Sequence, residues 1–200
     1  MIEDFSRGTL PYPCVPSMLC RHILCEVKTL IKITLDKRSK KEQITIDPYI
    51  PIDIKFGNWN EVEESPRYCR FGDFKKSLLE VGVSSISGQL RSITLVEAKD
   101  IYINSSNRSY EILNCEKGLP VLNDNRWEKT ERIDIQSHLK VSTLNDKIII
   151  SYGEGVVVKC IQSGRVKFGM NELDELCSIT VGDLTVDEMK ELNGSLKHML

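Results

Sequence analysis

Residues 164–200 read GRVKFGMNELDELCSITVGDLTVDEMKELNGSLKHML. Apolar and polar residues alternate over 166–170 and again over 176–181, as in strands with one buried face. The polar, acidic stretch 171–175 between them is typical of a turn, so the segment predicts a β-hairpin.

A short amphipathic helix is expected after this hairpin. Thr185 and Glu188 form a T-x-x-E pattern, which is typical of a capping box at a helix N-terminus. Apolar residues then recur at helical spacing, acids occupy the first turn and Lys197 and His198 the last, which matches the helix dipole. The segment holds no nucleophile with a base and no phosphate loop, so it indicates a scaffold or a binding surface.

An earlier segment resembles this hairpin. Residues 79–95, LEVGVSSISGQLRSITL, align with 166–181, so that Gly82 matches Gly169 and Ser-Ile-Thr occurs in both. An Ile-Asp-Ile tripeptide precedes each copy, at 52–54 and at 133–135. The hypothesis is an internal duplication; the alternative is that any two hairpins with such turns look alike.

Composition is that of an ordinary globular protein, with 28% charged and 40% hydrophobic residues. The net charge of −2 argues against a nucleic-acid binder over the whole surface, so no direct nucleic-acid contact is expected. Charge is unevenly spread, however. Residues 171–191 contain seven acids opposed by Lys190 alone, which predicts an acidic face.

The seven cysteines form an odd, scattered set without a C-x-x-C pair. This pattern favours unpaired, buried thiols in a reducing cytoplasm. Cys20, His22 and Cys25 lie close in sequence, but no second ligand pair follows at zinc spacing, so no metal site is expected. Charges interrupt the apolar stretch 17–31, so neither a secretion signal nor a membrane span is expected.

The order of the patterns predicts an α+β fold that is β-rich, with a mainly antiparallel sheet built from hairpins and the C-terminal helix packed on one face. Strands are expected within 22–35, 43–47, 50–56, 79–95, 98–103, 132–143, 147–152 and 156–161. Pro51 cannot donate a ladder hydrogen bond, so its strand is expected to lie at an edge or to begin there. Residues 43–47 are expected to pair back on 22–35. The expected organisation is a flexible arm at 1–20, a β-rich half at 21–104, a connector at 105–130 and a second half at 131–200, which together could form one continuous domain.

The sequence shows no catalytic motif. His22, His138 and His198 lie far apart in dissimilar contexts, and no dinucleotide or Walker pattern occurs. The run KRSKK at 37–41 is interpreted as a solvated loop, with phosphate binding as the alternative, although no aromatic residue is interleaved for base stacking. No enzymatic activity and no cofactor are expected.

The segments SLLEVGVSSISGQLRSITLV and GRVKFGMNELDELCSITVGDLTVDEMKEL resemble hairpins in small cytoplasmic immunity proteins of bacteria, encoded beside contact-dependent or other polymorphic toxins. The resemblance covers about half of the chain. It implies a protein without enzymatic activity that binds its cognate toxin domain and blocks the active site or substrate groove. Many such toxins are nucleases with basic surfaces, which an acidic partner suits.

The resemblance and the charge together predict an acidic partner-binding set: Glu172, Asp174, Glu175, Asp183, Asp187, Glu188 and Glu191. The alternative for each of these residues is an acidic surface that serves solubility. Two other classes stay open, a cytoplasmic hydrolase and a regulatory nucleic-acid-binding module that uses the basic N-terminal region. The sequence does not indicate an oligomeric state.

Overall fold

A computed structural model describes residues 31–58, 64–104, 115–153 and 155–200. Within these ranges the chain is rich in strands and ends in one α-helix, α1 (Val186–His198), so the prediction of a β-rich α+β fold is confirmed. The predicted arm at 1–20 and the Cys20, His22, Cys25 group lie outside the described residues.

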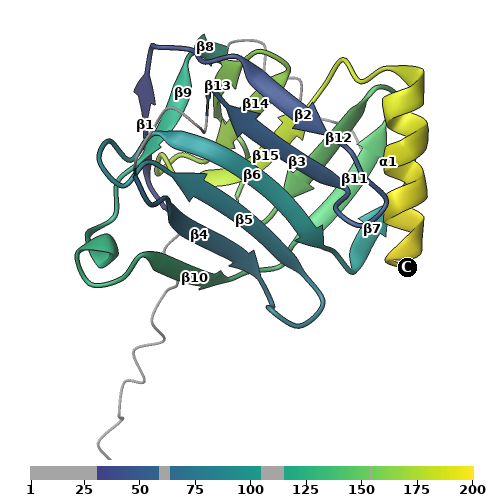
Figure 1. Cartoon of the computed structure of the whole chain (residues 1–200), viewed down its shortest axis with the longest axis horizontal. Coiled ribbons are helices and arrows are strands. Elements are labelled where there is room, and N and C mark those ends of the chain that lie inside the picture. Colours follow the sequence, from purple (N-terminus) through teal and green to yellow (C-terminus); the bar gives the residue numbers. More distant parts are fainter. Residues whose placement is uncertain (1–30, 59–63, 105–114, 154) are drawn as a thin grey trace, which may run out of the picture.

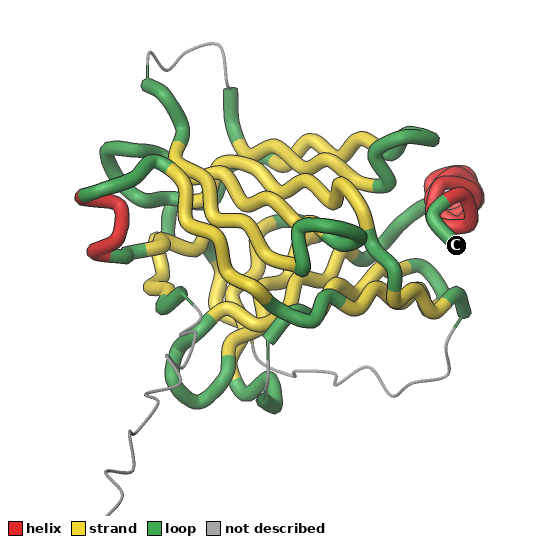
Figure 2. The backbone as a smooth tube through the Cα atoms, turned by 90° about the horizontal axis from the view of Figure 1, so that it is seen from below, coloured by secondary structure: helices red, strands yellow, loops and turns green. Residues whose placement is uncertain are grey.

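Two sheets pack face to face (Figures 1 and 2). One has the order β10-β4-β5-β6-β3-β2, formed by Arg132–Gln136, Arg67–Gly72, Leu78–Val83, Leu90–Glu97, Ile52–Phe56 and Glu42–Thr45. The other has the order β7-β11-β12-β15-β14-β13-β8, formed by Asp100–Tyr102, Lys140–Leu144, Lys147–Ser151, Leu176–Val181, Val166–Met170, Lys159–Ser163 and Cys115–Lys117. A two-stranded ribbon, β1 (Ile33–Asp36) with β9 (Leu119–Leu122), lies at one end.

The same strand order occurs in both sheets. The order β4-β5-β6-β3-β2 in one corresponds to β13-β14-β15-β12-β11 in the other, and the neighbours within each series are antiparallel. A strand from elsewhere adds in parallel beside β4 and beside β13, namely β10 and β8. The two sheets also exchange strands, because β7 follows β6 in the chain but pairs with β11 of the other sheet.

The core lies between the inner faces of the two sheets. Alternate residues of the strands point inward, as period-2 patterning requires, and Ile54, Val81 and Ile93 of one sheet are fully buried. Phe56 meets Phe168 with 6.0 Å between ring centroids, and Phe71 meets Tyr152 at 4.2 Å. These aromatic contacts join the two layers.

Helix α1 lies beside the sandwich rather than over a sheet face, which corrects the expected packing (Figure 2). The helix takes this position because it bonds to segments that lie along the seam between the two sheets. Thr143 of β11 donates to Asn193 Oδ1 at 3.2 Å, while Ser195 Oγ donates to the Pro48 carbonyl in the β2–β3 connection at 3.2 Å. The predicted capping box of Thr185 and Glu188 is confirmed.

Several predicted pairings are wrong. β1 and β2 do not pair with each other. β1 pairs with β9, and β2 pairs with β3. β3 lies between β2 and β6, so it is not an edge strand. The other expectation, that the strand begins at Pro51, is confirmed: Pro51 directly precedes Ile52, so its missing N–H removes no ladder bond.

Two further segments differ from the expectation. The two Ile-Asp-Ile strands, β3 and β10, occupy non-equivalent places in one sheet, so the tripeptides do not mark the start of two copies. The region expected to be a connector contains β8, β9 and the 3-10 helix η2 (Asn125–Glu128).

Candidate protein-binding surface

The predicted acidic set does not form one face. Residues 171–175 connect the antiparallel strands β14 and β15 at one end, whereas residues 182–185 follow β15 at its other end. A strand of six residues spans about 20 Å. The acids of the turn and those of the helix therefore form two separate surfaces, at opposite ends of β15.

The turn at 171–175, which we call the β14–β15 tip, is built around a buried asparagine. Asn171 Oδ1 accepts from the backbone N–H groups of Leu173 at 2.9 Å and Glu175 at 3.0 Å, and Asn171 Nδ2 donates to Glu175 Oε2 at 2.8 Å. Glu175 is only 6% exposed. It holds the turn from inside and cannot belong to a contact surface, which corrects its predicted role.

Neighbouring segments fix the β14–β15 tip further. The Ile33 N–H donates to the Asp174 carbonyl at 2.9 Å, and the Leu176 N–H donates to the Ile31 carbonyl at 3.1 Å. Lys159 Nζ forms an ion pair with Asp174 Oδ1 at 2.5 Å. The β14–β15 tip is thus held by its own hydrogen bonds and by two neighbouring segments of the chain.

The β14–β15 tip presents an apolar side chain between acids. Leu173 is 63% exposed, and Glu172 and Asp174 beside it are also exposed. The segment that precedes β13 runs alongside, since the Val158 N–H donates to the Met170 carbonyl, and it adds the exposed Val156 and Val158. An apolar centre with a charged rim is the usual composition of a protein-binding surface.

The acids at the start of α1 have mixed roles. Glu188 accepts hydrogen bonds from Arg165 and from the Thr185 N–H; the Arg165 hydrogen bond is the main cause that lowers the pKa of Glu188. Asp183 is exposed, and Asp187 and Glu191, four residues apart, lie exposed on one side of the helix. Glu188 therefore stabilises the helix start, whereas the other three are free to meet a partner.

The β5–β6 connection, residues 84–89, forms a comparable tip. It presents Ile86, and Glu64 holds it by accepting from Ser84 Oγ, Ser85 Oγ and the Ile86 N–H. Sequence reasoning missed Leu173 and Ile86, although each is an isolated aliphatic residue in a polar turn, and this is a signal that could have drawn attention to them.

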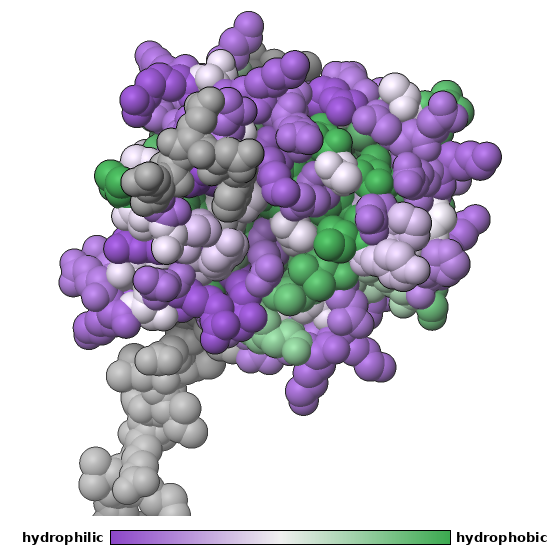
Figure 3. All heavy atoms as spheres, viewed as in Figure 1, coloured by the Kyte–Doolittle hydropathy of each residue, from purple (hydrophilic) through white to green (hydrophobic). Residues whose placement is uncertain are grey.

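The outer face of the six-stranded sheet offers a different, internally neutralised surface. Arg70 donates twice to Asp134, at 2.8 and 2.6 Å, and Thr94 Oγ1 donates to Asp53 at 2.7 Å across neighbouring strands. Figure 3 shows this side largely hydrophilic, with a smaller group of hydrophobic side chains near the middle. Its charges mostly satisfy one another, so it is a weaker candidate for partner recognition.

The described histidines do not form a catalytic group with a nucleophile. His138 Nε2 lies 2.5 Å from Asp100 Oδ2 on the surface, and His198 lies in the last turn of α1. No serine or cysteine of the described ranges bonds to either ring. Burial raises the pKa of the Cys69 thiol and that of Cys177, the latter to about 11, so neither is a reactive thiolate.

The cysteines differ from the expectation in one respect. Cys115 and Cys160 form a disulfide, whereas Cys69 and Cys177 are free and buried as expected. The reason is the parallel register of β8 and β13, which places Cys115 opposite Cys160. Within the described ranges no three His, Cys, Asp or Glu side chains are grouped to hold a metal ion.

No protein-family model and no curated protein matches this chain. Among the described residues, no helix is long and apolar enough to span a membrane.

Proposed function

We propose that this protein is an immunity protein that binds a cognate bacterial toxin domain and blocks its active site or substrate groove. The observation that carries the proposal is the rigid β14–β15 tip, which displays Leu173 between acidic side chains. A surface that is already ordered loses little conformational entropy on binding. Such a tip suits insertion into a groove of a partner.

Charge supports a partner with a basic surface, such as a nuclease. Glu172 is exposed beside the apolar centre, and Asp183, Asp187 and Glu191 add negative charge at the other end of β15. Asp174 adds little, because Lys159 pairs with it. Complementary charge raises association rates and excludes wrong partners. The tip makes the close contact in this proposal, and the helix acids steer the encounter.

The test is co-expression with the product of the gene immediately upstream, followed by affinity purification and a growth assay. The expected result is a toxic neighbour that the wild-type protein binds and neutralises. Leu173→Asp should weaken binding about 30-fold, because the contact loses about 2 kcal/mol of apolar burial. Ile86→Asp is the matched control, since Ile86 is an aliphatic residue of the β5–β6 connection that is 85% exposed.

A harmless or non-binding neighbour would contradict the proposal. Equal losses of binding in Leu173→Asp and Ile86→Asp would place the contact outside the β14–β15 tip. Both side chains are exposed, so neither variant is expected to unfold the protein.

The proposal includes a cytoplasmic location, where an intracellular toxin would act. The Cys115–Cys160 disulfide argues in the other direction, because cytosolic reductants keep most thiols reduced. Trapping of free thiols in intact cells tests this point. Quantitative labelling of both cysteines would agree with a cytoplasmic site, and their protection would contradict it.

We also propose that the two sheets descend from one duplicated unit. Gly82 pairs with Ser92 and Gly169 with Ser178, and each hairpin has a register shift directly after its glycine. The shared strand order supports the same origin. Related chains whose halves share clear sequence identity would support duplication, and relatives with differently ordered halves would contradict it.

A further inference from the structure

Five exposed lysines gather at the end of the molecule opposite the β14–β15 tip. Three of them lie in the β1–β2 connection, one ends β8 and one lies in β14; we call them the lysine surface, and they are Lys37, Lys40, Lys41, Lys117 and Lys167. Figure 1 shows the β1–β2 connection crossing the top of the molecule beside β8.

Strand register aligns two of these lysines. Gln162 of β13 is paired with Lys117 on one side and with Lys167 on the other, so the three side chains share the outer face of the sheet. Neighbouring strands lie about 4.8 Å apart, which places the two lysine Cα atoms about 10 Å from each other. At this separation of their Cα atoms, Lys117 and Lys167 can each contact a different anionic group.

The β1–β2 connection is anchored against this end of the sheet. Ser163 Oγ donates to the Lys40 carbonyl at 3.3 Å, and the Gly57 N–H donates to the Lys41 carbonyl at 3.0 Å. Gly118 packs so closely on the Asp36 carbonyl that a Cβ would lie 2.2 Å from its oxygen. The lysines of the connection are therefore held near Lys117 by contacts of the backbone.

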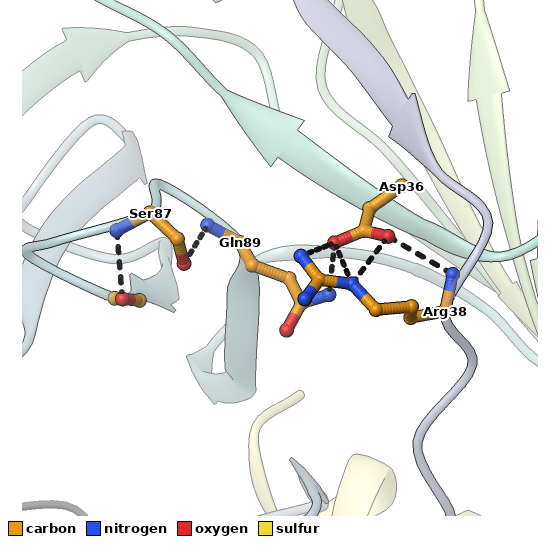
Figure 4. A network of polar contacts seen from close by, with 5 residues as sticks. Asp36, Arg38, Ser87 and Gln89 are labelled. Carbon is orange, nitrogen blue, oxygen red and sulfur yellow. Dashed lines mark hydrogen bonds and ion pairs between the residues drawn. The ribbon is translucent and has the colours of Figure 1, made fainter.

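Carboxylates at this end of the molecule accept hydrogen bonds from groups other than the five lysines. Asp36 accepts from Arg38 Nη2 at 2.8 Å and from Gln89 Nε2 at 2.9 Å (Figure 4), and the hydrogen bonds from Arg38 lower the pKa of Asp36 to about 2. Glu42 accepts from the Arg165 N–H at 3.0 Å. Glu116 is exposed but adjoins Lys117 in the strand, so it points to the opposite side. In the part of the chain that the structure describes, none of the five lysines has an ion-pair partner.

We propose that the lysine surface binds the backbone phosphates of a nucleic-acid duplex. Unpaired lysines on an ordered support are the groups that neutralise phosphates. Single-strand binders also need aromatic side chains for base stacking, and the lysine surface contains none, which favours a duplex read through its backbone without sequence preference. The expectation of no nucleic-acid contact rested on net charge, which averages over surfaces of opposite sign.

The lysine surface is independent of the toxin-binding proposal, because Lys167 lies near the start of β14 and the β14–β15 tip follows the end of that strand. The test measures fluorescence anisotropy of a labelled duplex of about 20 base pairs of random sequence over a series of NaCl concentrations. Wild-type protein should bind with a log–log salt slope of roughly −3 to −4.5, which corresponds to about three to five phosphates at 0.9 each.

Two double variants carry the test, Lys40→Glu with Lys41→Glu and Lys117→Glu with Lys167→Glu. Each should weaken binding at least about tenfold and reduce the slope by about 2. The matched control is Lys75→Glu with Lys76→Glu, a pair of exposed lysines in the β4–β5 connection at the far end of the other sheet. The control should keep wild-type affinity.

Three outcomes would overturn the proposal: no duplex binding at low salt, equal losses in the control and the test variants, or binding to vesicles of anionic phospholipid in preference to the duplex. Capture of the upstream gene product by the lysine variants is measured in parallel. If the lysine variants still capture the gene product but no longer bind the duplex, the lysine surface and the β14–β15 tip are separate sites. The same conclusion follows if Leu173→Asp loses capture of the gene product but still binds the duplex.

Discussion

Glu64 and Arg91 form an ion pair with an N–O distance of 3.1 Å, and their side chains are 8% and 4% exposed. Burial is the largest influence on the pKa of Glu64 and raises it, but the bonds from Ser84, Ser85 and the Ile86 N–H, with the charge of Arg91, together lower it. The carboxylate is thus charged and holds the β5–β6 connection.

Glu64→Gln should therefore lower the free energy of unfolding by about 3 kcal/mol at neutral pH, because it removes the charge that faces Arg91. Chemical denaturation measures the change. Asp134→Asn is the control, since the Arg70–Asp134 pair is partly exposed and should contribute less than about 1 kcal/mol. Similar losses in both variants would contradict the structural role of Glu64.

The same residue gives a pH dependence. A carboxyl whose folded pKa lies below its ordinary value of 4.5 stabilises the fold above that value, and the contribution is lost as pH falls through the folded pKa. Wild-type stability should fall below about pH 4.5, and Glu64→Gln should fall less steeply over the same range. Parallel curves would show that other acids account for the loss.

The sequence pattern around Glu64 is polar and does not reveal its partner. Its partner Arg91 lies 27 residues away, and their contact depends on the fold of the β5–β6 connection. Asn171 and Glu175 are similar, because an acidic turn has the same pattern whether its carboxylates face solvent or bond inward. The residue types show where polar groups occur in the sequence. Only the burial of each side chain in the fold shows which of them are accessible to a partner.

At the scale of elements, the two hairpins place a glycine opposite a serine. A Cβ at Gly82 would lie 2.4 Å from Ser92 Oγ and 3.4 Å from the Tyr68 ring, whereas one at Gly169 would lie 2.3 Å from Ser178 Oγ and 2.7 Å from Val157 Cγ1. A serine hydroxyl can rotate away. The β-branched side chain of Val157 has fewer rotamers available and therefore less freedom to move away.

Gly169→Ala should accordingly cost about 1–3 kcal/mol of unfolding free energy, and Gly82→Ala less than about 1 kcal/mol. Denaturation midpoints of the two variants measure the difference. Adding Val157→Ala to Gly169→Ala should recover most of the loss, since it removes the two methyl groups in contact. Equal costs at both glycines, or no recovery, would show that Val157 does not limit the space.

Alternation located most of the strands but not their partners. The patterns over residues 166–170 and 176–181 matched β14 and β15. The reason is that a strand with one buried face has apolar residues at alternate positions of its own sequence. Pairing of β1 with β9, and of β10 with β4, depends on contacts far apart in the chain. Register and neighbour choice are therefore set by the assembled sandwich.

At the scale of the whole molecule, the two halves are interlocked rather than joined by a linker. β7 follows β6 but pairs with β11, and β10 precedes β11 but pairs with β4. Each sheet thus contains strands from both halves, and α1 contacts both at the seam. We expect one cooperative unfolding transition for the sandwich.

The disulfide adds a covalent closure to this arrangement. Cys115 and Cys160 are 45 residues apart and join the short edge strand β8 to β13. Closing a loop of that length removes about 4 kcal/mol of chain entropy from the unfolded state. Cys115→Ala with Cys160→Ala should lower the unfolding free energy by about 2–4 kcal/mol, measured by denaturation without reductant.

Reductant supplies the control for this prediction. It should shift the wild-type midpoint to that of the double variant and leave the double variant unchanged, because the described free thiols, Cys69 and Cys177, are buried and unpaired. A wild-type midpoint that does not move under reducing conditions would mean that the bond contributes no stability. In that case the parallel ladder of β8 with β13 alone would hold this edge in place.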